Sequence, residues 1–270
     1  MVSIVGFRLP ALYCDAFCRA VGDNVAGTSR PRHFVVNWRA VWIRSMLMND
    51  ATVRRRCFRE PIAEIYDSAR YLDAAVSAHL SGHTALAAEL FALANDKAVW
   101  NWTDSVWGRR SAYVIVAKSA SAVVKAAKTT ERMPTAEQKA EVLRRDGFHC
   151  RYCGIPVIRT EIRKSIHRAY PLEVPWGKAN ALQHSAFQAM WAQYDHVVPH
   201  THGGTNELDN LVLACAACNF GKMHYTLEEL GLADPRLYGA KNSLWNGLER
   251  FLAEGIQPSI KQTPVDASPD

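Results

Sequence analysis

Four cysteines of the 270-residue chain lie in two pairs with the spacing Cys-x-x-Cys. The first pair is Cys150 and Cys153, and the second is Cys215 and Cys218. A two-residue gap lets both thiolates of a pair bind one ion, and zinc favours four such ligands in a tetrahedron. Because 61 residues separate the pairs, more than in a usual zinc finger, we expect one structural Zn²⁺ that joins two distant segments.

Polar residues between and beside these cysteines are of the types that hydrolyse phosphodiesters. Asp195 and His196 are adjacent, Asn210 precedes the apolar run LVLA, and Asn219 follows the last cysteine. Hydrolysis needs a base that works near pH 7, such as imidazole, and a cation that neutralises the charge on the phosphate. Carboxylate and amide oxygens favour Mg²⁺ or Mn²⁺ over softer ions. The sequence therefore predicts a second metal centre, separate from the zinc.

The segment YDHVVPHTHGGTNELDNLVLACAACNFGKMH, with the earlier RRDGFHCRYCG, resembles the HNH endonuclease family. The Asp-His pair, the GGTNELDNL loop and the Cys-x-x-Cys-Asn step agree with the family in order and spacing. The resemblance covers roughly residues 130–235. It implies a ββα-metal fold, in which two antiparallel strands and a helix surround one divalent ion. It also implies an endonuclease that cleaves DNA to 5′-phosphate and 3′-hydroxyl ends.

The resemblance implies a role for each matched residue. His196 matches the general base, and Asp195 and Asn219 match the ligands of the catalytic metal. Asn210 matches the asparagine that fixes the loop and the histidine by hydrogen bonds, so the chain is an H-N-N variant. Neighbouring residues of a regular strand point to opposite faces. Asp195 and His196 can therefore serve one ion only where the strand ends or bends.

Basic residues near the first cysteine pair are candidate contacts for the phosphates of DNA, with double-stranded DNA as the expected substrate. Residues 135–178 carry 9 basic and 5 acidic side chains. Neutralisation of the backbone supplies most of the nonspecific affinity for DNA. Lys222, one turn after the last motif asparagine, is equally explained as a solvated helix residue. The candidates are Lys222, Arg144, Arg145, Arg151, Arg163, Lys164 and Arg168.

Hydrophobic periodicity predicts the elements that position these residues, in an α+β fold. Apolar residues at helical spacing over 59–80, 84–108 and 111–128 make residues 1–130 a helical domain of unknown role. The nuclease domain spans 131–235, with an insertion at about 154–194. Its predicted helices are one begun by a Thr135–Gln138 capping box, one over 180–193 and a short capped one over 226–236. Residues 236–270 are expected to form a C-terminal helix and a disordered tail.

Composition bounds the class of protein. With 49% hydrophobic and 21% charged residues, the chain is neither disordered nor collagen-like nor a pure coiled coil. No window approaches the roughly 18 apolar residues of a membrane-spanning helix, and we expect a cytoplasmic protein without membrane contact. The net charge of +6 is concentrated in residues 1–130, which hold 17 Lys/Arg and 10 Asp/Glu. This balance favours a polyanionic partner.

Two alternatives to a free-standing nuclease stay open. The chain could be a zinc-stabilised nucleic-acid-binding or adaptor module whose nuclease centre is idle, which would bind DNA without turnover. It could also be a subunit of a restriction, defence or mobile-element system that is silent until a partner activates it. In that case the N-terminal helical domain would bind a protein partner or self-associate.

Overall fold

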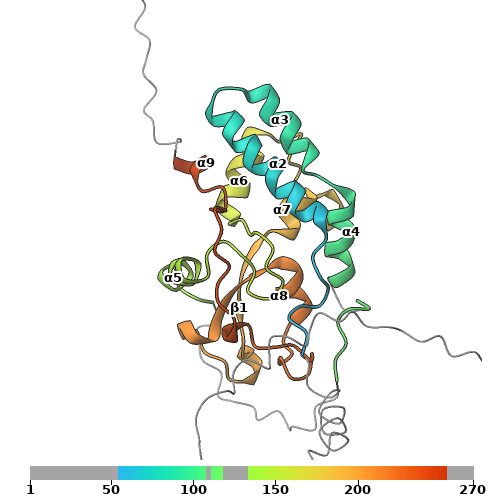
Figure 1. The fold of residues 1–270 in the computed structure, drawn as a ribbon, viewed down its shortest axis with the longest axis vertical. Coiled ribbons are helices and arrows are strands. Elements are labelled where there is room, and N and C mark those ends of the chain that lie inside the picture. The colour runs from blue at the N-terminus through green and yellow to red at the C-terminus, as the bar shows by residue number, and fades with distance from the viewer. Residues whose placement is uncertain (1–53, 108–110, 118–132, 254–270) are drawn as a thin grey trace, which may run out of the picture. The chain divides into compact units, whose positions relative to one another are not determined.

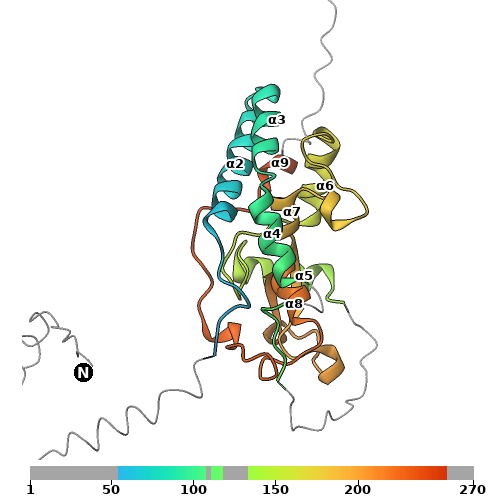
Figure 2. The same cartoon turned by 90° about the vertical axis from the view of Figure 1, so that its right-hand side faces the viewer.

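The structure is a computed structural model that describes residues 54–107, 111–117 and 133–253, a mixture of helices and one small sheet (Figures 1 and 2). All of these residues belong to one compact unit, Val53–Asp270. No helix within the described ranges is long and apolar enough to cross a membrane. The predictions for residues 1–53, for the boundary at 130 and for the C-terminal tail fall outside the described residues.

Two antiparallel helices open the described chain. Helix α2 (Ala63–Leu80) buries one apolar face, including Leu72 and Val76, as the periodicity predicted. Gly82 then adopts a positive φ of 81°, which a residue with a Cβ rarely adopts, and α3 (Thr84–Leu93) runs back along α2. Figure 1 shows these two helices as a hairpin.

The stretch 84–108 is two helices, so the prediction of one helix is wrong. Helix α3 ends at Leu93 and α4 (Lys97–Val106) begins after Asp96. The Asp96 carboxylate accepts a hydrogen bond of 2.6 Å from the backbone N–H of Ala98 and so caps α4. A side-chain cap can start a new helix without glycine or proline, which is why periodicity missed the break.

Residues 111–117 are not helical, which corrects part of the helix predicted over 111–128; residues 118–128 lie outside the described part of the chain. The segment has one turn, in which the N–H of Val114 donates to the carbonyl of Ser111, and the N–H of Ala117 donates to the carbonyl of Glu229 at 2.8 Å.

A two-stranded sheet followed by a helix forms the centre of the second half. Strand β1 (Ala192–His196) pairs antiparallel with β2 (Leu211–Cys215), and helix α8 (Ala216–Lys222) follows directly. The pairing sets Asp195 opposite Val212 and His196 opposite Leu211. Every residue of β2 is buried, which explains its uninterrupted apolar sequence. The loop between the strands contains the short 3-10 turns η2 (His200–His202) and η3 (Leu208–Asn210).

The remaining elements surround this ββα unit. Helix α5 (Ala136–Asp146) begins with the predicted capping box, in which Thr135 and Gln138 each bond the other's backbone. The region of the predicted insertion holds α6 (Thr160–Ala169), η1 (Asn180–Leu182) and α7 (Ser185–Ala189). The prediction of a single helix over 180–193 is therefore wrong: the range holds a 3-10 turn and a five-residue α-helix, and its last two residues belong to β1.

The helix predicted over 226–236 is also wrong. Thr226 and Glu229 exchange the hydrogen bonds of a helix start, but the chain leaves after one turn at Gly231, whose φ is 60°. Only a 3-10 turn, η4 (Pro235–Leu237), follows. The described chain ends in the four-residue helix α9 (Arg250–Ala253).

One hydrophobic core runs through the described α-helices and both strands. Helix α4 packs against α7 and α8 (Figure 2). Helix α5 packs against β2, and α9 packs against α2 and α6. The largest fully buried side chains include Trp102 of α4, Phe91 of α3 and Phe187 of α7. The helices before residue 107 therefore share a core with the elements that carry the motif residues.

Candidate functional site

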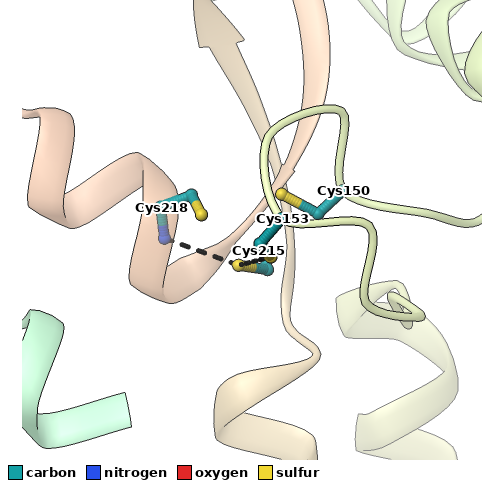
Figure 3. A group of neighbouring side chains, drawn as sticks. All are labelled: Cys150, Cys153, Cys215 and Cys218. Carbon is teal, nitrogen blue, oxygen red and sulfur yellow. Dashed lines mark hydrogen bonds between the residues drawn. The ribbon is translucent and has the colours of Figure 1, made fainter. Parts of the chain in front are cut away.

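The two cysteine pairs meet. The ligand atoms of Cys150, Cys153, Cys215 and Cys218 all lie within 4.8 Å of one another, and Figure 3 shows their sulfurs gathered in one group. Cys150 and Cys153 lie on a tight loop after α5, Cys215 ends β2, and Cys218 lies in the first turn of α8. This loop is joined to β2 by a 2.8 Å bond from the N–H of Arg151 to the carbonyl of Leu213.

The geometry fits a tetrahedral zinc ion. Zn–S bonds of about 2.3 Å place tetrahedral sulfurs about 3.8 Å apart. The Sγ atoms of Cys153 and Cys215 are 3.6 Å apart. Burial raises the pKa of the Cys153 thiol, and hydrogen bonds with the other three cysteines, together with burial, raise the pKa of the Cys218 thiol. A group of thiolates here therefore requires a compensating cation. The cluster can hold zinc, and four cysteine ligands leave no open position for substrate.

His196 is the last residue of β1, and a neighbouring asparagine fixes its ring. The Nε2 atom of His196 lies 2.7 Å from Oδ1 of Asn206, and Nδ2 of Asn206 donates to the carbonyl of Met133 at 3.2 Å. Since the Asn206 amide gives its N–H₂ to a carbonyl, its oxygen faces the imidazole and Nε2 carries the proton. The lone pair of His196 is then on Nδ1. Sequence reasoning missed Asn206, although it lies within the quoted GGTNELDNL loop.

Asn210 fixes the loop that carries Asn206 rather than bonding His196. Its Oδ1 accepts from the N–H of Val198 at 2.8 Å, and its Nδ2 donates to the carbonyls of Val198 and Thr205. The loop is tight here, because a Cβ on Gly204 would lie 1.8 Å from the Val198 carbonyl oxygen. Asn210 therefore fixes the loop, as the resemblance implied, but the hydrogen bond to His196 comes from Asn206 instead.

The side chain of Asp195, in β1, is buried, and each of its carboxylate oxygens accepts a hydrogen bond. Its side chain is 5% exposed; Oδ1 accepts from Nζ of Lys222 at 3.2 Å and Oδ2 accepts from the hydroxyl of Tyr152 at 2.6 Å. Burial raises the pKa of the Asp195 carboxyl, and the Lys222 ammonium opposes that rise. Lys222 is 1% exposed and also donates to the carbonyl of His196 at 2.7 Å. Its ammonium faces Asp195 rather than a surface that DNA could reach.

Asn219 lies in the middle of α8, beside β1. Its Nδ2 donates to Oε1 of Gln193 at 3.5 Å, which leaves the amide oxygen for a cation. Asp195, His196 and Asn219 all line one open cleft of about 1710 Å³, together with His200. The cleft is therefore lined by an aspartate, an asparagine and a histidine, residue types that can supply oxygen and nitrogen ligands to a hard divalent cation.

Three of the arginines predicted to contact DNA are engaged within the protein. Arg145 and Arg151 both bond the fully buried carboxylate of Asp146 at 2.7 Å, which in turn accepts from the N–H of Leu213 at 2.9 Å. Arg163 is 6% exposed and lies with its guanidinium carbon 3.6 Å from the ring centre of Trp176. These side chains support the fold around the site.

The other basic candidates are exposed, as Arg145 is, but they have fewer partners within the protein. Lys164 and Arg168 project from α6, and Arg144 forms an exposed ion pair with Glu141. Charge counting along the sequence cannot separate such residues from Arg145 and Arg151, because the distinction depends on which carbonyls and carboxylates the fold brings near them.

Residues 184–224 match the family model of the HNH endonuclease. The matched range begins at the cap of α7 and includes β1, the loop, β2 and α8. The chain thus carries an HNH endonuclease domain, as the motif predicted. Comparison with curated proteins and with solved structures gave no match.

Proposed function

We propose that the chain is a divalent-metal-dependent endonuclease that hydrolyses phosphodiester bonds of DNA, with His196 as the general base. The observation that carries the proposal is the environment of the His196 ring. The bond from Nε2 to Asn206 holds the imidazole in the tautomer whose Nδ1 can accept a proton. That histidine lines the same cleft as Asp195 and Asn219.

Asp195 and Asn219 are the proposed ligands of the catalytic metal. One Mg²⁺ or Mn²⁺ ion, when bound, would neutralise charge on the phosphate and on the leaving 3′ oxygen. Asp195 supplies the negative charge, Asn219 supplies a neutral oxygen, and His196 Nδ1 takes the proton of the attacking water. The products of this reaction are 5′-phosphate and 3′-hydroxyl ends. A separate Zn²⁺ on the four cysteines has a structural role.

Double-stranded DNA is the proposed substrate, and the exposed cations of α6 are the proposed phosphate contacts. Lys164 and Arg168 are one turn apart on one helix face, where both reach solvent. If each neutralises one phosphate, replacing either by alanine weakens binding uniformly across sequences and reduces the salt dependence by about one charge. Alanine at the buried Arg163, by comparison, should destabilise the fold.

Cleavage of supercoiled plasmid tests the proposed function. The full-length zinc-loaded protein is incubated with Mg²⁺, with Mn²⁺ and with a chelator that spares the zinc, beside the variants His196→Ala and Asn206→Ala. We expect nicking or linearisation only with metal, complete loss in His196→Ala, and a fall of about 10²-fold in Asn206→Ala, the size typical of a misplaced base. Undiminished cleavage by a folded His196→Ala variant would refute the proposal.

A partner-activated nuclease is the second candidate, and the ion pair of Lys222 with Asp195 favours it. The ammonium occupies one oxygen of the proposed metal ligand at 3.2 Å. A partner or DNA that displaces Lys222 would free that oxygen for metal. This candidate predicts DNA binding without turnover by the isolated chain, and metal-dependent turnover after addition of a partner that binds it directly.

A further inference from the structure

A tyrosine of the zinc-binding loop reaches the proposed ligand of the catalytic metal. Tyr152 lies between Cys150 and Cys153, and its side chain is 2% exposed. Its hydroxyl donates to Oδ2 of Asp195 at 2.6 Å. The two metal centres are therefore separated by one side chain and one hydrogen bond.

The two donors to Asp195 fix the plane of its carboxylate. Tyr152 bonds Oδ2 and Lys222 bonds Oδ1, so the carboxylate cannot rotate without losing one of these bonds. An ionised carboxylate has about four acceptor positions, and two donors leave the others for a cation. Asp195 is one of the residues that line the cleft, although only 5% of it is exposed.

The two donors differ in how they act once a divalent cation is present. The ammonium of Lys222 carries a positive charge that repels such a cation, whereas the hydroxyl of Tyr152 is neutral. Tyr152 can therefore keep its bond to Asp195 with the metal in place. Donors of this kind orient metal ligands, and their loss typically costs 10- to 100-fold in metal affinity.

We propose that Tyr152 is a positioning residue, which couples the zinc-bound loop to the catalytic metal by holding the carboxylate of Asp195. The inference rests on the proposed function, since it takes Asp195 as a metal ligand. It explains why a structural zinc lies beside a hydrolytic centre: the zinc fixes the loop, and the loop fixes the carboxylate.

Mn²⁺ binding to Tyr152→Phe tests the inference without relying on cleavage. The full-length zinc-loaded protein is titrated with Mn²⁺, and the loss of the free-ion signal in electron paramagnetic resonance gives the dissociation constant. Tyr170→Phe is the matched control, because Tyr170 is also buried and its hydroxyl lies 2.7 Å from Nδ1 of His79, at neither metal centre. Zinc content and the unfolding temperature are measured for every variant.

We expect Tyr152→Phe to bind Mn²⁺ at least about 10-fold more weakly while it retains zinc, and Tyr170→Phe to bind as the wild type does. In the background of Asp195→Asn, adding Tyr152→Phe should change nothing further. Wild-type affinity in Tyr152→Phe, with binding lost in Asp195→Asn, would overturn the inference and leave the proposed metal site intact. Wild-type affinity in Asp195→Asn would overturn both.

Discussion

Acidification should weaken the attachment of the N-terminal helices to the nuclease domain through His184. This residue is fully buried at the cap of α7; its Nε2 lies 2.9 Å from the carbonyl of Phe91 in α3, and its Nδ1 accepts from the N–H of Phe187. Both bonds require the neutral ring with its proton on Nε2. Burial lowers the pKa of His184 from 6.5 to about 4.

The sign and size of the effect follow from that pKa. Because the folded-state pKa is depressed, the unfolded chain binds the proton first, so stability is complete above pH 6.5 and falls as the pH drops toward 4. A shift of this size is worth about 3 kcal/mol in full, of which about 2 kcal/mol is lost by pH 5. Stability above pH 7 is untouched by this residue.

Urea unfolding at pH 7.5 and pH 5 measures the effect, with His184→Gln as the comparison. Glutamine retains a donor for the Phe91 carbonyl but cannot titrate, and loss of the cap should cost about 1 kcal/mol at pH 7.5. Between the two pH values, His184→Gln should lose about 2 kcal/mol less than the wild type. The buried His149, whose pKa is also lowered to about 4, titrates equally in both proteins and cancels.

Equal losses in the two proteins would refute this reasoning. The same experiment also tests whether the helices before residue 107 unfold together with the nuclease elements. A single transition followed by tryptophan fluorescence and by circular dichroism is expected from the shared core. Two separate transitions would show that the His184 contact does not couple them.

Three further predictions concern the scaffold of the site. Gly204→Ala should reduce cleavage by at least about 10-fold, because a Cβ would meet a backbone carbonyl at 1.8 Å and displace the loop that holds His196, the proposed general base; plasmid cleavage and zinc content measure it. Asp146→Asn should lower the free energy of unfolding by about 3 kcal/mol in urea, because two arginines lose their buried counter-charge. Cys218→Ser should lower zinc occupancy and the unfolding temperature of the whole unit, since a zinc ion on the four cysteines would join two segments 61 residues apart. Unchanged stability in either of the last two variants would contradict the roles assigned here.

Much of the ββα unit could be predicted from the sequence because its signals are local. The Thr135–Gln138 capping box begins α5, and the apolar run LVLA forms the fully buried β2. The two cysteine pairs lie together, as expected if all four thiolates bind one ion. These features follow from spacing and residue type, with little help from the rest of the fold.

The contacts of charged and amide side chains could not be predicted in the same way. Arg145 and Arg151 have the same residue type as an exposed DNA contact, yet each donates to carbonyls brought near by the fold. Asn206 and Asn210 are both loop asparagines, and only the path of the loop decides which one reaches His196. Tertiary partners, rather than local pattern, determine these roles.

The small size of the ββα unit explains why so many other elements pack around it. Two five-residue strands and a seven-residue helix bury too little surface to be stable alone. The loop that carries Cys150 and Cys153 lies against β2 and the first turn of α8. Trp107, just after α4, stacks on Phe220 of α8 with ring centres 4.8 Å apart. Phe220 is the neighbour of Asn219, so the segment that follows α4 contacts α8, the helix that carries this proposed metal ligand. A change in how those helices pack should therefore alter metal binding as well as stability.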